Sequence, residues 1–336
     1  MPSFSSAPAA VRRKPLAVWL VALVFLVLVL AGVSVFIGAS QVSLLTLFSA
    51  HPDAMASQVL VVSRIPRTLA LILAGMSMAV AGSIMQMLAR NRFVEPSTAG
   101  TVESASLGLL VVALTAPGLP PFGKMVIASL FALAGTALFL AILRRIPLRS
   151  ALIVPLVGLV LGGVISAVTT FFAYRYDLLQ SMHAWTTGDF SAVLRGRYEL
   201  LWISLALTVV AYTAADRFTV AGMGADFATN VGLNHRRMMN LGLVIVSMVT
   251  ASVVVTAGIV PFLGLIVPNL VSLFMGDNMR RSLPWVAVLG AAFVLACDLA
   301  GRLVLYPYEI PIGTIVGVVG SAVFLTLLLR GRATFA

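Results

Sequence analysis

The sequence predicts an all-α, polytopic membrane protein with about ten transmembrane helices. Of its 336 residues, 60% are hydrophobic and only 10% are charged, whereas soluble domains average about half and a quarter. The apolar residues also form long runs, and a helix needs roughly 20 mostly apolar residues to cross a bilayer. At about 30 residues for each span and its loop, the chain has room for about ten spans.

A polar segment begins the chain, and a regular succession of apolar runs follows it. Residues 1–15 are rich in Ser, Ala and Pro, and we expect them to form a disordered cytoplasmic tail. The run Leu16–Gly38 is longer than the ~7–15 apolar residues of a signal peptide, so it is predicted to be a first span. Residues 16–332 are expected to form a single transmembrane domain. The further predicted spans are Thr68–Leu88, Ser97–Thr115, Met125–Leu143, Ala151–Ala173, Leu200–Ala215, Met239–Val260, Phe262–Met275, Leu283–Val304 and Pro311–Leu329.

The basic residues predict the orientation of these spans. An even number of spans places both termini on one side of the membrane. With the N-terminus inside, roughly two thirds of the 22 Lys and Arg residues lie on the cytoplasmic side, as the positive-inside rule requires. An N-in, C-in topology is therefore predicted. The net charge of +11 does not indicate a nucleic-acid partner, because the basic residues form short clusters between apolar runs and no basic face.

Catalytic and metal-binding patterns are absent from the sequence. Cys297 is the single cysteine, and His51, His183 and His235 are far apart in the chain, so no metal site is expected. The segment Gly118–Met125 nearly matches the phosphate-binding pattern G-x4-G-K-[ST], but Met stands where a hydroxyl is needed. The chain is therefore not expected to be an enzyme, and any ATP would be hydrolysed by another subunit.

Charges within or beside the predicted spans are costly there and are therefore informative. Glu103 is either a pore-facing carboxylate or a residue paired inside the bundle. Asp298 and Arg302 are four residues apart, so they can pair on one helix. Arg64 and Arg67 precede the second predicted span, where they either anchor to lipid phosphates or recognise acidic groups on an external protein.

Small residues recur at helix-packing spacing, as in Gly75, Ala79 and Ser83, and they predict close contact between helices. The predicted inner loop Arg217–Met238 contains three glycines and a short amphipathic piece, Asp226–Leu233. A structured inner loop of this kind is a place where a soluble partner could press on the membrane domain.

Several different short motifs follow one another along the chain. They are Arg64-Ile65-Pro66-Arg67, Ala81-Gly82 with Gln86, Asn91-Arg92-Phe93-Val94-Glu95-Pro96, Trp185 with Gly188, Gly264-Leu265-Ile266-Val267-Pro268, Asp298-Leu299-Ala300-Gly301-Arg302 and Glu309-Ile310-Pro311-Ile312-Gly313. Their order and spacing resemble the FecCD family, the permeases of type II ABC importers for siderophores, haem and vitamin B12. Arg92-Phe93-Val94 replaces the commoner P-L-A, and Asn269 stands where His is usual. This variant looks like the branch that imports catecholate-type ferric siderophores.

The resemblance implies a vitamin B12 permease-like fold and a second permease subunit, either the same chain or a paralogue, with the pathway between the two. It also implies two cytoplasmic ATPase subunits, a periplasmic or lipid-anchored substrate-binding protein, a ferric siderophore as cargo, and a location in the bacterial inner or plasma membrane. No catalytic residue, metal or cofactor is implied for this chain. The residues given roles are Arg64, Arg67 and Arg302 for binding-protein docking; Gly222, Asp226, Ala228 and Gly232 in an ATPase coupling loop at about residues 217–238; and Asn91, Glu103 and Ser150 as pathway or gate candidates.

An ion-coupled secondary transporter that works without an ATPase is the alternative. Such a transporter would need several buried carboxylates or a proton relay within the membrane. Only Glu103 and Asp298 are candidates for that role.

Overall fold

The computed structural model describes residues 14–37, 58–146 and 153–331 of the chain. These residues are almost entirely helical. The β-type backbone pairing among them is a single isolated bridge between Thr187 and Ile259. Residues 1–13 of the predicted tail lie outside the described residues, and the first helix begins at Lys14. The gate candidate Ser150 also lies outside the described residues.

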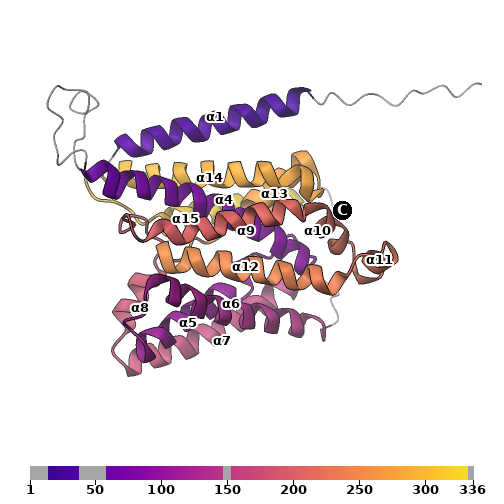
Figure 1. Cartoon of the computed structure of the whole chain (residues 1–336), viewed down its shortest axis with the longest axis horizontal. Coiled ribbons are helices and arrows are strands. Elements are labelled where there is room, and N and C mark those ends of the chain that lie inside the picture. The colour runs from indigo at the N-terminus through magenta and orange to yellow at the C-terminus, as the bar shows by residue number, and fades with distance from the viewer. Residues whose placement is uncertain (1–13, 38–57, 147–152, 332–336) are drawn as a thin grey trace, which may run out of the picture.

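The helices follow one another with short links (Figure 1). In chain order they are α1 (Lys14–Phe36), α4 (Ile65–Leu88), α5 (Thr101–Thr115), α6 (Pro121–Leu143), α7 (Ile153–Arg175), α8 (Leu179–Thr186), α9 (Leu201–Thr213), α10 (Ala215–Gly222), α11 (Ala225–Asn230), α12 (His235–Ala257), α13 (Leu263–Met275), α14 (Met279–Leu303) and α15 (Ile312–Gly331). Single turns of π- or 3-10 helix precede three of them, namely η1 (Leu60–Arg64), η2 (Pro96–Thr98) and η3 (Tyr198–Leu200).

Each of the ten predicted spans overlaps one of these helices, in chain order α1, α4, α5, α6, α7, α9, α12, α13, α14 and α15. By length and composition, six helices of the described residues could each cross a membrane. The pair η3–α9 and α10, bent by 67°, could form a seventh span, and α5, α13 and α15 are shorter apolar helices. The prediction of an all-α membrane protein with about ten transmembrane helices is confirmed.

The start of the third span differs from its prediction. The run was expected to be helical from Ser97, whereas α5 begins at Thr101. Pro96 starts a 3-10 turn, and Gly100 adopts a left-handed φ of 75°. Such irregular backbone is tolerated at membrane depth only where other parts of the protein surround it, and the segment from Asn91 to Gly100 is mostly buried.

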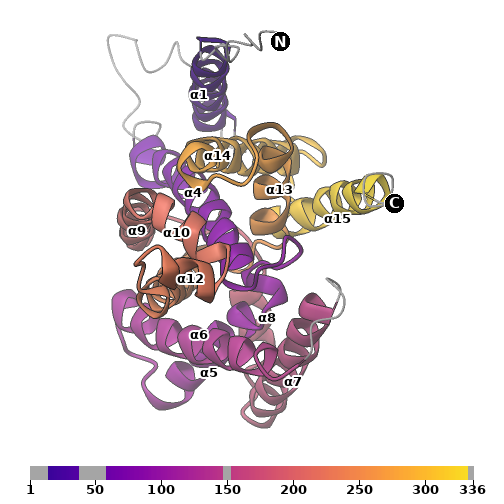
Figure 2. The same ribbon diagram turned by 90° about the vertical axis from the view of Figure 1, so that its right-hand side faces the viewer.

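Helix α4 runs through the centre of the bundle (Figure 2), and 78% of its span is buried, against 11% for α1. Glycine pairs let other helices come close to it. A Cβ atom on Gly75 would lie 2.7 Å from the carbonyl oxygen of Gly290 on α14, and one on Gly82 would lie 2.1 Å from that of Gly264 on α13. The prediction that small residues mediate close helix packing is confirmed at Gly75, because only a backbone without side chains fits this crossing.

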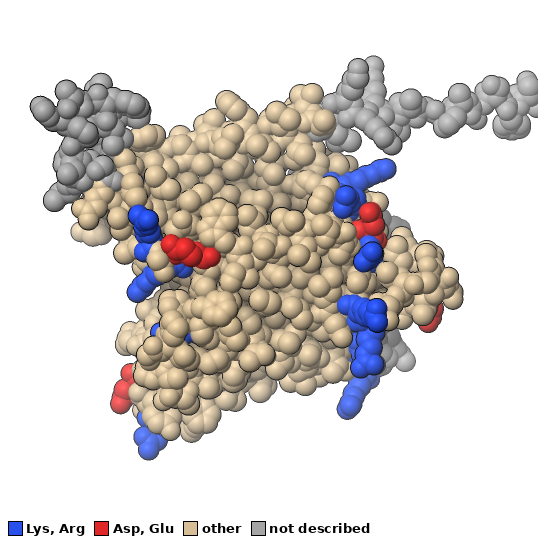
Figure 3. All heavy atoms as spheres, in the orientation of Figure 1, with Lys and Arg blue, Asp and Glu red and all other residues tan. Residues whose placement is uncertain are grey.

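Charged side chains gather at the two ends of the visible face, and the surface between them is almost free of charge (Figure 3). The start of α1 and the end of α15 lie at the same end, together with α10 and α11 (Figure 1). We call this the inner end, after the predicted orientation, and the opposite end, which carries α8, the outer end. The uncharged belt is the region that a bilayer would cover.

Candidate functional site

An ion-pair network lies at the outer end between α4 and α14. Nη2 of Arg67 is 2.8 Å from Oδ1 of Asp298, and its Nη1 is 2.7 Å from Oε2 of Glu309. Arg302 pairs with the same aspartate, one turn earlier on α14. The predicted Asp298–Arg302 pair is therefore present, and Arg67 and Glu309 extend it toward the surface, where 28% of the Glu309 side chain is exposed.

Two of the arginines predicted to dock a partner hold the end of α1. Nη1 of Arg64 donates to the carbonyl oxygens of Val35 and Phe36 at 3.1 and 3.0 Å. Nη1 of Arg302 donates to those of Ser34 and Ile37, both at 2.9 Å. The last carbonyls of a helix have no partner within it, and the negative end of the helix dipole favours cations. The guanidinium groups therefore fix the outer end of α1, a helix that is otherwise largely exposed.

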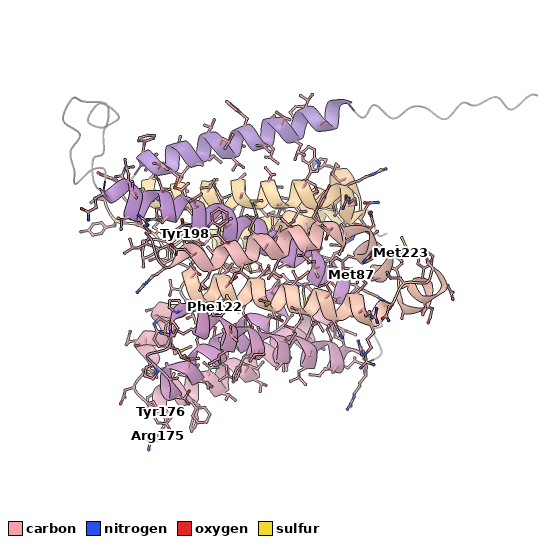
Figure 4. The ribbon with its side chains drawn as sticks, viewed as in Figure 1. Met87, Phe122, Arg175, Tyr176, Tyr198 and Met223 are labelled. Atoms are coloured by element: carbon pink, nitrogen blue, oxygen red, sulfur yellow. The ribbon has the colours of Figure 1, made fainter. Side chains whose placement is uncertain are left out.

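Burial limits what these arginines can contact. Arg64 is 6% and Arg302 4% exposed, whereas Arg175, Arg195 and Arg197 at the same end are exposed; Figure 4 shows Arg175 at the outer edge of the molecule. The structure thus joins Arg67 and Arg302 through Asp298 and places Arg64 and Arg302 at the same end of α1, and contact of the three with a partner stays a prediction. The three exposed arginines were not singled out by sequence, since nothing but their place in outer loops marked them.

Glu103 lies in the first turn of α5, beside a cavity of about 320 Å³. The cavity is lined by hydroxyl groups, including those of Ser166 and Thr169 on α7, and by His183 on α8. Oε2 of Glu103 is buried without a hydrogen-bond partner in the described part of the chain. Glu103 thus lines a cavity and shows no bundle partner for Oε2 among the described residues, and its role as a pore-facing carboxylate stays a prediction.

Glu95 is a buried residue whose role the sequence did not reveal. It is 1% exposed, and its Oε1 accepts a hydrogen bond from the backbone N–H of Phe262 at 2.8 Å, directly before α13. Its carboxylate also accepts from the hydroxyl of Ser97, and its backbone N–H donates to the hydroxyl of Thr98 at 2.9 Å. A carboxylate at a helix N-terminus is favoured by the helix dipole. Glu95 therefore joins the α4–α5 link to α13, and the Glu95–Thr98 spacing of a capping box was the available signal.

The gate candidate Asn91 and Gly222, a residue of the predicted coupling loop, line one cavity of about 410 Å³ at the inner end. Met87 and Met223, which also line it, both lie at this end in Figure 4. Contacts from α13 and from the link that follows it hold the adjacent backbone. Nδ2 of Asn269 donates to the carbonyl of Arg92 at 2.8 Å, and Arg92 pairs with Asp277 at 2.5 Å. The end of α10 and Asn91 therefore share the wall of one cavity at the inner end.

The predicted coupling loop contains the two short helices α10 and α11, and α11 projects beyond the spans at the inner end (Figure 1). Gly224 between them has a φ of 129°, and Gly232 after them has a φ of 81°, values that favour glycine. Ala228 on α11 is fully buried, and Asp226 on the same helix is exposed. Met223, Phe227 and Val231 are also exposed, by 62, 48 and 62%. Met223 caps the end of α10, Phe227 lies within α11, and Val231 caps the end of α11. We call these three exposed apolar residues the inner stripe.

Among the described residues, no group of three His, Cys, Asp or Glu side chains lies close enough together to hold a metal ion.

Comparison with known proteins identifies the chain at the family level. The FecCD transport family model matches residues 23–330. The chain belongs to the FecCD transport family. It is 49% identical to the petrobactin import system permease protein YclN of Bacillus subtilis (strain 168) over 311 residues, which cover 93% of this chain and 98% of YclN. It is 42% identical to the ferric-anguibactin transport system permease protein FatD of Vibrio anguillarum over 304 residues, which cover 90% and 96% of the two chains.

A solved structure described as an inward-facing conformation of a metal-chelate type ABC transporter has the same fold. Its TM-score is 0.79 at 23% identity, and the match covers 94% of this chain and 99% of that one. The family predicted from the motifs is thus confirmed, and so is the fold that it implied.

Proposed function

We propose that this FecCD protein is the permease subunit of an ABC importer that passes a ferric siderophore, of the catecholate type, into the cytoplasm. The relatives named for petrobactin and anguibactin import support this class of cargo. The permease would lie in the bacterial inner or plasma membrane, with two ATPase subunits inside and a substrate-binding protein outside.

The inner stripe is the observation that carries this proposal. Exposed apolar side chains are expected where helices face lipid, but α11 projects past the spans, where its surroundings are aqueous. An apolar patch in that position marks a contact with another protein. An ATPase bound to α11 would displace the adjacent helix α10, which lines the same cavity as Asn91. The inner stripe therefore supports coupling of ATP hydrolysis to the inner gate.

The pathway would lie between two permease subunits. Helices α7 and α15 flank one side of the molecule (Figure 2), and only 22% of the α7 span is buried. The exposed apolar residues of α7 include Leu156, Val160 and Val164. A second subunit packed against this side would enclose a space next to α7. The cavity that Glu103 lines is also lined by residues of α7, so it would adjoin that space.

Reconstitution with partners tests the proposed function. The purified chain alone is expected to show no ATPase activity, and the complex with its ATPase and binding protein is expected to show activity stimulated by the ferric siderophore. Full binding of the ATPase without any stimulation by cargo would count against an importer.

Docking of the binding protein is tested by charge reversal. R64E/R67E is expected to weaken docking, and R195E/R197E serves as the comparison at exposed sites. The amount of each variant in the membrane and its thermal stability separate loss of docking from loss of folding. If docking survives R64E/R67E or is lost only in R195E/R197E, the assignment of the buried arginines is wrong.

The alternative, an ion-coupled transporter, receives less support. Within the described residues few carboxylates are buried, and Glu95 and Asp298 are engaged by a backbone N–H group and by arginines. Glu103 lines a cavity, and its buried Oε2 has no hydrogen-bond partner in that part of the chain. Transport driven by an ion gradient in the absence of any ATPase would favour this alternative.

A further inference from the structure

A hollow of about 740 Å³ opens at the inner end between α6 and α12, beside the end of α4. The two helices lie side by side in both ribbon views (Figures 1 and 2). Its lining combines basic residues, Arg90, Arg144, His235 and Arg236, with an apolar wall that includes Leu140. None of the described residues that line it is acidic.

The arginines of this hollow, Arg90, Arg144 and Arg236, have no carboxylate partner among the described residues. The Nδ1 atom of His235 is buried without a hydrogen-bond partner. Clustered cations next to an apolar wall are stabilised when an anion occupies the space between them. The basic part of the hollow therefore fits a phosphate group.

A second hollow continues along the same two helices, deeper in the membrane. It has a volume of about 220 Å³ and an almost wholly apolar lining, with Leu130 and Leu133 from α6 and Val244 and Met248 from α12. At 1.5 Å per residue, the distance along α12 from His235 to Met248 is about 20 Å. This is about the depth of one leaflet, since half of a bilayer with its headgroups measures roughly 20 Å.

We propose that the groove between α6 and α12 binds one anionic phospholipid of the cytoplasmic leaflet. Its phosphate lies against Arg90, Arg144 and Arg236, and an acyl chain follows the apolar hollow toward Met248. Basic pockets between transmembrane helices on the cytoplasmic side suit such headgroups, and the apolar continuation selects a lipid over a soluble phosphate. The inference depends on the predicted N-in, C-in topology, which places this end of the molecule in the cytoplasm. It does not depend on the identity of the cargo or on an ATPase.

The site adjoins the proposed coupling machinery. Ala225, the first residue of α11, lines the basic hollow. Arg90 lines both this hollow and the inner cavity that contains Asn91. A bound lipid would therefore contact both the coupling element and the wall of the inner gate.

Lipid titration with native mass spectrometry of the full chain in detergent tests the headgroup. The probe is phosphatidylglycerol, with phosphatidylcholine as the zwitterionic comparison. R144Q/R236Q is compared with R145Q/R237Q, which removes the same charge from neighbouring exposed arginines that do not line the hollow. At about tenfold per 1.4 kcal/mol and 1 kcal/mol per basic residue, R144Q/R236Q is expected to weaken phosphatidylglycerol binding roughly thirty-fold. The control is expected to bind like the wild type.

Three results would overturn the proposal. They are an equal loss of phosphatidylglycerol binding in both variants, binding of phosphatidylcholine as tight as that of phosphatidylglycerol, and displacement of phosphatidylglycerol by millimolar inorganic phosphate. If R144Q/R236Q keeps the lipid but loses a partner ATPase, the hollow is a protein contact instead.

The acyl chain is tested by phosphatidylglycerol that carries a photoreactive group near the end of one chain. The proposal predicts cross-links to the segments around Leu130–Leu133 and Val244–Met248. Cross-links spread evenly over the lipid-facing helices, with none enriched in these segments, would contradict a defined site.

Discussion

Arg302 joins α14 to the outer end of α1, and replacement by glutamine tests this connection. In the wild type its guanidinium pairs with Asp298 and donates two hydrogen bonds of 2.9 Å to α1 carbonyls and one of 3.2 Å to the Ser34 hydroxyl. The residue is 4% exposed. Breaking a buried ion pair costs about 3–5 kcal/mol, because one charge is left without its partner. Arg302→Gln is expected to be destabilised by about that amount.

Thermal unfolding of the purified permease measures this loss, and limited proteolysis near residue 37 reports release of α1. The expected fall in Tm is on the order of 10 °C. Arg302→Lys, which keeps the charge but not the two-pronged geometry, should lie between wild type and Arg302→Gln. The exposed Arg197→Gln should change stability by less than about 0.5 kcal/mol. If Arg302→Gln unfolds like Arg197→Gln with α1 still protected, the anchoring role is refuted, and docking becomes the better account of this arginine.

The structure supports three further predictions. Gly82→Ala should lower Tm and reduce the free energy of unfolding by at least ~1–3 kcal/mol, because its Cβ would lie 2.1 Å from a backbone oxygen of α13. Gly163→Ala is the control, because a Cβ there would have nothing within 4 Å. Equal losses of stability in the two variants would contradict the close crossing of α4 and α13. Phe227→Ala should weaken ATPase affinity roughly tenfold or more in a pull-down titration. Phe171→Ala, which is near the outer end of α7 and is also apolar and exposed, should leave the affinity unchanged. Unchanged affinity in Phe227→Ala would remove the inner stripe from the interface. Glu103→Gln should change stability by less than ~1 kcal/mol, since Oε2 has no partner to lose, but should slow uptake; a marked fall in Tm would favour a role in the bundle.

The long spans could be predicted because apolar length alone defines them. Helix α1 matches its predicted run closely, since lipid demands a helix of about 20 apolar residues whatever packs on it. The start of α5 could not be placed in this way. Ser97 and Thr98 are compatible with a span, and only the contact of Glu95 with α13 shows that the chain enters the bundle in an irregular conformation.

The candidate sites were predicted less completely than the fold, because side-chain partners depend on helices far apart in sequence. The Asp298–Arg302 pair is local, so its spacing predicted it. The bonds from Arg64 and Arg302 to the end of α1 span 28 residues or more, and no local pattern signals them. Motif resemblance gave these arginines a role but not their burial.

The predicted coupling loop shows the same limit. Its glycines and amphipathic piece predicted a structured element between two spans, and the structure has the helices α10 and α11 in this segment, whereas its coupling role stays a prediction. The inner stripe could not be distinguished by sequence from ordinary buried positions. It became visible only because α11 projects from the bundle, with Phe227 exposed and Ala228 buried.

Cargo uptake into proteoliposomes tests the central claim most directly. The vesicles would hold this permease with its ATPase subunits, with the binding protein and a radioiron-labelled siderophore outside and ATP inside. The account predicts uptake that requires ATP, the binding protein and an intact inner stripe, and that persists after ionophores abolish proton and sodium gradients. Uptake by the permease alone, driven by an ion gradient and indifferent to ATP, would contradict it.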